Sequence, residues 1–78
     1  MAKPVIFTVS AIWDVEARVW SGHCDDIPAA AEAPTLDELL EKVSQMALDL
    51  APENHPDVEP ASIFIQVTAL REAMPAAA

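Results

Sequence analysis

The sequence predicts a small α+β domain in which one helix packs on one face of a small, mainly antiparallel sheet, in the order β-β-β-α-β. Segments in which polar and apolar residues alternate, as in strands, lie near both ends of the 78-residue chain. Between them lies one segment with apolar residues at helical spacing. The connecting segments are short and rich in proline or aspartate, which favour turns.

The first strand is expected in PVIFTVSAIWD, where apolar residues recur with a period of two. One side of this strand is apolar throughout: Val5, Phe7, Val9, Ala11 and Trp13. The other side mixes apolar and polar residues: Ile6, Thr8, Ser10 and Ile12. DVEA predicts a turn and RVWSGHC a second strand, so the two strands form a hairpin.

A second turn and a short third strand are expected next. Pro28 in DDIP cannot donate a hydrogen bond to a sheet, and aspartate favours turns. The third strand is expected over residues 29–33, although alanine has a low strand propensity.

The clearest pattern in the chain is the helical one in TLDELLEKVSQMALDLAP. Thr35 is a natural N-cap, and Glu38 three residues later completes a capping box. Pro52 predicts the end of the helix near Ala51. The apolar stripe expected to face the sheet is Leu36, Leu39, Leu40, Val43, Ala47 and Leu50.

Alternation returns in ASIFIQVTALRE, which predicts the last strand. We expect one domain over residues 1–73 and a flexible tail over residues 74–78. A single helix covers only one face of the sheet, which leaves the other face without a cover. That second face is expected to bind a partner through Ile6, Ile12, Trp20, Phe64 and Leu70.

The composition favours association with other proteins. Hydrophobic residues make up 53% of the chain, whereas a domain of this size buries only about 60% of the surface of its unfolded chain. We therefore expect self-association into a homodimer or a larger oligomer. The net charge of −9 suits a basic partner. Four basic residues are too few to neutralise several phosphates, so direct binding to nucleic acid or to an anionic membrane is not expected.

The expected location is the cytoplasm. Cys24, the one cysteine, cannot form an intramolecular disulfide, which fits a reducing compartment. The apolar stretch near the N-terminus is interrupted by Thr8 and Ser10 and precedes no cleavage motif of a signal peptide. ASIFIQVTAL, the longest strongly apolar run, is far shorter than a membrane span.

The stretch SGHCDD concentrates residue types that could form a metal or catalytic site. His23 and Cys24 are adjacent on a strand and therefore point to opposite faces, so one ion cannot bind both without a bend. Asp25 and Asp26 would add hard oxygen ligands to a soft thiolate, which is an unusual combination. We interpret the stretch as a strand that enters a turn, and expect no cofactor, no metal and no enzymatic activity.

Three motifs together resemble the HicB-like antitoxin domain, especially short, uncharacterised bacterial relatives without a DNA-binding segment: WDVEARVW, DDIP and TLDELLEKV. Asp26, Ile27 and Pro28 match the turn of that family, and Thr35, Leu36 and Glu38 match its helix start. The family usually has glycine where this chain has Ala29, and full-length antitoxins carry a DNA-binding segment after this domain.

The resemblance implies a partial ribonuclease-H-like fold that binds and masks a small basic RNA-cleaving toxin without being an enzyme. The two-metal chemistry of ribonuclease H would need several carboxylates. Asp14 and either Glu38 or Glu41 could contribute, but Glu38 is already explained by capping. The last strand offers no acid between Ala61 and Arg71. The alternative is a homodimeric domain that binds a small ligand or has a regulatory role, without a toxin partner.

Overall fold

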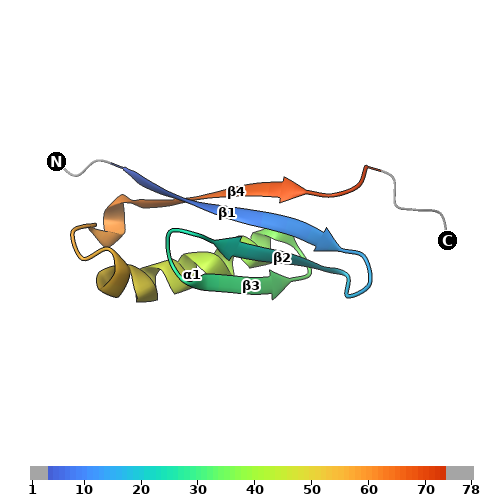
Figure 1. Ribbon diagram of the computed structural model, residues 1–78, viewed down its shortest axis with the longest axis horizontal. Helices are drawn as coiled ribbons and strands as arrows, with labels where there is room; N and C mark the ends of the chain where they lie inside the picture. Colours follow the sequence, from blue (N-terminus) through green and yellow to red (C-terminus); the bar gives the residue numbers. More distant parts are fainter. Residues whose placement is uncertain (1–3, 74–78) are drawn as a thin grey trace.

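The computed structural model describes residues 4–73, in which four strands form one sheet and one α-helix packs on it (Figure 1). The elements are β1 (Val5–Asp14), β2 (Val19–Cys24), β3 (Ala29–Ala33), α1 (Leu36–Asn54), the 3-10 turn η1 (Pro60–Ser62) and β4 (Ile63–Leu70). The strands lie in the order β3-β2-β1-β4. The predicted α+β fold and its element order are confirmed, while the predicted tail, 74–78, lies outside the described residues.

The sheet is mixed, because its strands pair in two ways. β1 pairs antiparallel with β2, and β2 antiparallel with β3, through two short connections. β4 returns to the sheet after α1 and runs parallel to β1. A helical crossover is the usual way to join parallel strands, so α1 carries the chain back to the start of the sheet.

The turn between β1 and β2 fixes the register of the hairpin. Asp14 Oδ1 accepts hydrogen bonds from the backbone N–H groups of Glu16 (3.0 Å) and Ala17 (3.1 Å). Arg18 has a φ of 57° and is the one non-glycine residue with positive φ in 4–73. Ala29, in contrast, lies in β3 with a conformation that does not require glycine.

Trp20 does not lie on the uncovered face, so that prediction is wrong. The hairpin places Trp20 opposite Trp13, and directly opposed residues of an antiparallel pair share one face. Trp20 is therefore buried on the helix side, with its ring 5.4 Å from that of Trp13 in an edge-on arrangement. The guanidinium of Arg71 covers the Trp13 ring at 4.4 Å.

The start of α1 agrees with the predicted N-cap, whereas its end does not agree with the prediction. Thr35 Oγ1 accepts a hydrogen bond from the backbone N–H of Glu38 at 3.1 Å. The helix continues through Pro52 to Asn54. Proline there removes only one donor from the last turn, in which Asn54 Nδ2 donates to the Leu50 carbonyl at 2.9 Å.

The core lies between α1 and the side of the sheet that α1 covers. Its buried apolar residues are Phe7, Val9, Ala11, Trp20, Cys24, Ile27, Ala29, Ala33, Leu39, Val43, Ala47 and Ala51. The prediction that Leu40 belongs to this core is wrong. α1 lies mainly against β3 and β2 (Figure 1), so a residue on its flank toward β4 is not covered by the sheet. Leu40 lies on the flank of the helix toward β4 and is 37% exposed.

Gly22 allows α1 to approach β2 closely. A Cβ atom at this position would lie 3.0 Å from Leu39 Cδ2 and 3.1 Å from Val9 Cγ1. These distances are shorter than ordinary van der Waals contacts, so any larger side chain must push the helix or its neighbours away. The glycine is therefore required for packing rather than for a turn.

Candidate protein-interaction surface

The sheet has one face that no described element covers, which we call the open face. Its residues alternate along the strands with the core residues: Ile6, Thr8, Ser10, Ile12, Ser21, His23, Ala30, Glu32, Phe64, Gln66, Thr68 and Leu70. The period of two in β1 and β4 produces this face directly, since successive side chains of a strand point to opposite sides. Four of the five residues predicted to bind a partner lie here, and Trp20 does not.

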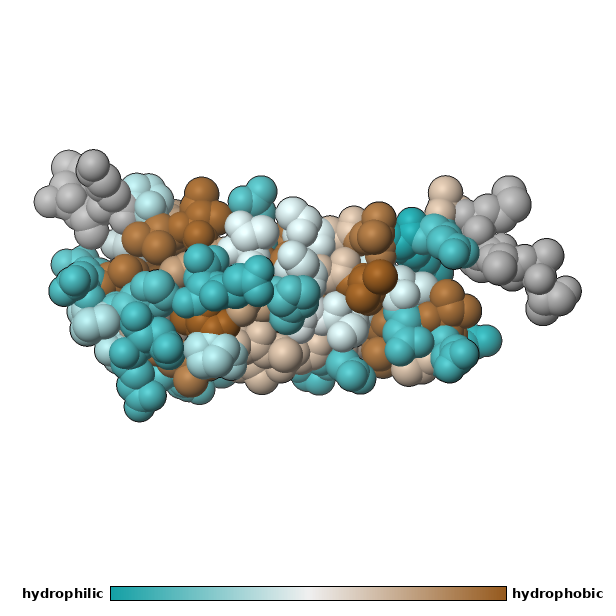
Figure 2. All heavy atoms as spheres, viewed as in Figure 1, coloured by the Kyte–Doolittle hydropathy of each residue, from teal (hydrophilic) through white to brown (hydrophobic). Residues whose placement is uncertain are grey.

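Two apolar pairs stand at opposite ends of the open face. Ile6 is the register partner of Phe64, and Ile12 is the register partner of Leu70. All four are large side chains: Ile6 is 57% exposed, Phe64 56%, Ile12 54% and Leu70 68%. Figure 2 shows hydrophobic side chains near both ends of the sheet, with paler and more polar ones between them.

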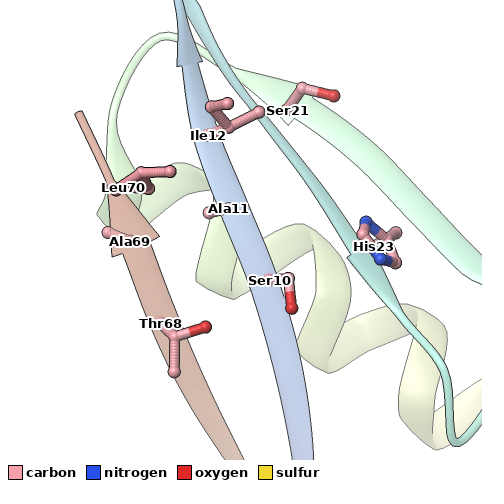
Figure 3. Close-up of a pocket in the computed structure, with 8 residues that line it drawn as sticks. All are labelled: Ser10, Ala11, Ile12, Ser21, His23, Thr68, Ala69 and Leu70. Carbon is pink, nitrogen blue, oxygen red and sulfur yellow. The ribbon is translucent and has the colours of Figure 1, made fainter. Parts of the chain in front are cut away.

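A row of polar side chains separates the two apolar pairs. Thr68, Ser10 and His23 are register partners across β4, β1 and β2, and Figure 3 shows them side by side on one face. Together with Ile12 and Leu70 they line a depression of about 350 Å³. The open face thus combines exposed apolar anchors with hydroxyl and imidazole groups that can make hydrogen bonds.

Charged side chains lie around the open face rather than on its centre. Asp14 and Glu72 lie near one end, Asp25 follows β2 at the other, and Glu32 lies on β3. Several further acids lie on the exposed side of α1, across the molecule. The open face therefore has an apolar and polar centre with an acidic margin.

The structure divides the HCDD stretch between the two faces of the sheet, as predicted for a strand that enters a turn. His23 is exposed on the open face, while Cys24 is buried on the helix side. Asp26 Oδ2 accepts a 3.3 Å hydrogen bond from the backbone N–H of Thr8, and the Asp26 carbonyl lies 2.6 Å from His55 Nε2. Asp26 and His55 therefore fasten the β2–β3 turn to β1 and to the end of α1.

Ser10, His23 and Asp25 superficially match the residue types of a serine hydrolase. His23 Nε2 lies 3.7 Å from Asp25 Oδ1, and the two side chains are 61% and 93% exposed. Such a site needs a nucleophile that is hydrogen-bonded to its base. Ser10 and His23 are register partners that line one hollow, but no hydrogen bond joins their side chains in the described residues. Within 4–73, no group of three or more histidine, cysteine, aspartate or glutamate side chains is placed to hold a metal.

Sequence reasoning missed two exposed apolar residues on α1. Leu40 and Leu48 are 37% and 45% exposed, and with Ser44 they form one wall of a groove beside β4. Ile63 and Ile65 form the other wall, and the groove has a volume of about 290 Å³. The sequence did contain a signal for this exposure, because an apolar stripe that is too wide for one sheet contact leaves its margin exposed.

No helix within residues 4–73 is both long enough and apolar enough to span a bilayer.

Comparisons with known proteins give a family but no activity. Residues 6–77 match the family model of a domain of unknown function, DUF1902. The chain is also similar to a solved structure, hypothetical protein TTHA1013 from the extremely thermophilic bacterium Thermus thermophilus. The two are 38% identical with a TM-score of 0.73, over 90% of this chain and 99% of that one. The comparison with curated proteins finds no match. The chain belongs to the DUF1902 family.

Proposed function

We propose that this protein is a non-enzymatic interaction domain of the HicB-like type, which binds a small basic protein through its open face. The observation that carries the proposal is the pair of apolar clusters on that face, Ile6 with Phe64 and Ile12 with Leu70. Each of these four side chains is more than half exposed, although Phe7, Val9 and Ala11 on the other face of β1 are buried. Exposed apolar residues of this density on a small domain are typical of binding surfaces.

The charge distribution supports a basic partner. The domain has 13 acidic and 4 basic residues, and acids lie at both ends of the open face and on β3. A basic partner would bury its apolar residues against the two clusters and place its lysines or arginines against the acidic margin. Such complementarity mainly raises the association rate and selects the partner, while the apolar centre provides most of the affinity.

The chemistry of the partner is proposed from the resemblance to HicB-like antitoxins. A small RNA-cleaving toxin has a basic surface, because it must bind phosphates. An acidic domain that covers this surface excludes RNA by occupying the site and repelling the phosphates. Inhibition by this route requires no catalytic group in this chain.

The test combines capture from the native host with a functional readout. The tagged chain should retain a small basic protein that cleaves RNA when purified alone and is inhibited when the chain is added back. Leu70→Glu and Ile12→Glu should weaken both binding and inhibition. Gln45→Glu, which adds the same charge on the exposed side of α1, should leave both unchanged.

Two results would contradict the proposal. The first is a captured basic protein whose RNA cleavage the chain does not inhibit. The second is equal inhibition by wild type and Leu70→Glu, which would move the binding surface away from the open face. Binding should also weaken with added salt, since the proposed margin is electrostatic.

A further inference from the structure

The two edges of the sheet differ in how they are protected from pairing with another strand. β3 and β4 are the edge strands, because the sheet order is β3-β2-β1-β4. Each has backbone N–H and C=O groups on its outer side that no neighbouring strand binds within the described residues. Such an edge is a template for a further strand unless charges, prolines or short length block it.

The β3 edge carries several of these protections. The strand has only five residues, and it is bounded by Pro28 and Pro34. Glu32 places a charge on it, and Lys42 Nζ donates a 2.8 Å hydrogen bond to the Glu32 carbonyl. The hollow on this side of α1 is polar, being lined by Glu38, Glu41, Lys42 and Gln45.

The β4 edge carries none of them. IFIQVTAL has eight residues and contains no charge, no proline and no glycine. In Figure 1, no described element lies beyond β4 on the side away from β1. An uncharged strand of this length and high β-propensity is the type of edge that adds another strand.

Exposed apolar side chains gather around the same edge. Seven large hydrophobic residues are exposed in 4–73: Ile6, Ile12, Val15, Leu40, Leu48, Phe64 and Leu70. Each lines a hollow that also contains a residue of β4. On the helix side this is the groove with Leu40 and Leu48, and on the open face it is the hollow with Ile6 and Phe64. The β4 edge is therefore flanked by apolar surface on both faces of the sheet.

We infer that the β4 edge is a homodimer interface, in which β4 pairs antiparallel with β4 of a second copy and the two sheets become one. Two chains that each carry a net charge of −9 repel one another wherever acids face acids. The β4 edge is uncharged, so identical copies can approach there. Antiparallel pairing is also self-complementary about a twofold axis, as an isologous interface requires.

This arrangement makes a further contact between the helices. A twofold axis perpendicular to the sheet places both copies of α1 on the same face. Leu40 and Leu48 of one copy then face their counterparts across the paired strands and close the two grooves. The open faces stay uncovered, so the dimer goes beyond the proposed partner binding and is compatible with it.

The test measures self-association of the purified chain alone, so its outcome is independent of whether a toxin partner exists. Sedimentation velocity should show a concentration-dependent dimer for the wild type. Leu48→Lys and Gln66→Lys add a positive charge at solvent-exposed positions beside the edge, so they are expected to preserve the fold. Both should weaken dimerisation by at least about tenfold, because two like charges meet across the axis.

Matched controls separate this interface from the alternatives. Gln45→Lys, on the outer side of α1, and His23→Lys, on the open face away from β4, should both retain the dimer. Hydrogen exchange should show β4 backbone amides that are protected in the wild-type dimer and lose protection on dilution or in Leu48→Lys. Near-ultraviolet circular dichroism of Trp13 and Trp20 checks that each variant is folded.

Three outcomes would overturn the inference. One is a wild-type monomer at concentrations of about 100 μM, where even a weak dimer with a Kd in the micromolar range is populated. Another is dissociation by His23→Lys but not by Leu48→Lys, which would indicate stacking of two open faces. The third is a dimer whose β4 amides exchange as fast as those of the monomer.

Discussion

The two faces of the sheet are formed by the same strands but differ in the exposure of their apolar side chains. In β1, Phe7, Val9 and Ala11 are 2%, 0% and 4% exposed, whereas Ile6 and Ile12, which precede and follow them, are 57% and 54% exposed. The helix-covered face holds the core, and the open face holds residues of similar hydrophobicity that no described element covers. Hydrophobicity alone therefore does not identify the core of a domain this small, and the position of the one helix decides which face is buried.

The largest expected effect is on the covered face. Leu39→Ala removes a side chain that is 0% exposed and packs over Gly22, so it should lower the free energy of unfolding by about 2–5 kcal/mol. Leu40→Ala, on the adjacent position of the same helix, should cost clearly less because Leu40 is 37% exposed. Urea denaturation monitored by tryptophan fluorescence measures both. Equal losses for the two variants would mean that the helix is rotated relative to the structure.

Adding a methyl group at the contact between α1 and β2 should lower the free energy of unfolding almost as much as Leu39→Ala does. Gly22→Ala forces a Cβ atom to within 3.0 Å of Leu39 Cδ2, so we expect a loss of about 1–3 kcal/mol from overpacking. Ser21→Ala, next to it on the open face, changes a half-buried side chain that points away from the helix and serves as the control. A Gly22→Ala variant as stable as wild type would show that the helix can move away at little cost.

The alternation in β1 and β4 was enough to predict which of their residues share a face, because the period of a strand fixes this locally. The placement of Trp20 required more, since the face of a second strand depends on the register that the 15–18 turn sets. A one-residue change in register moves every side chain to the other face. The pattern of β2 alone, with Val19 and Trp20 adjacent, does not contain that information.

The helix shows the same limit of sequence reasoning. The apolar stripe correctly predicted Leu39, Val43 and Ala47 in the core. It could not show that Leu40 is exposed while these three are buried. Which part of the stripe is buried depends on where the helix crosses the sheet and not on the helix itself. The parallel return of β4 beside β1, which creates the unprotected edge, is likewise a consequence of tertiary packing.

A moderate loss of stability is expected from a change at the N-terminus of α1. Thr35→Ala removes the side-chain oxygen that accepts a 3.1 Å hydrogen bond from the Glu38 N–H, so it should cost about 1 kcal/mol. Thr35→Ser, which keeps the oxygen, should restore most of the loss. Thermal unfolding followed by circular dichroism measures the three proteins. If serine and alanine destabilise equally, the role of Thr35 lies in its methyl group and not in capping.

The smallest effect is expected on the open face, and it depends on protein concentration. Phe64→Thr and Leu70→Thr remove side chains that are 56% and 68% exposed, and threonine keeps a high strand propensity. In dilute protein the free energy of unfolding should therefore change by no more than about 0.5 kcal/mol. Ile65→Thr, half-buried on the helix side of the same strand, should cost more at every concentration.

Raising the concentration should then separate wild type from Phe64→Thr. A dimer that binds only the folded chain stabilises it by mass action, so the wild-type melting temperature should rise with concentration. The rise should be smaller for Phe64→Thr, because Phe64 lies on β4 itself and lines the groove with Leu40 and Leu48 that the inferred dimer would close. A large loss for Phe64→Thr in dilute protein would instead mean that the open face contributes to folding of the single chain, and that the two faces differ less than their exposures indicate.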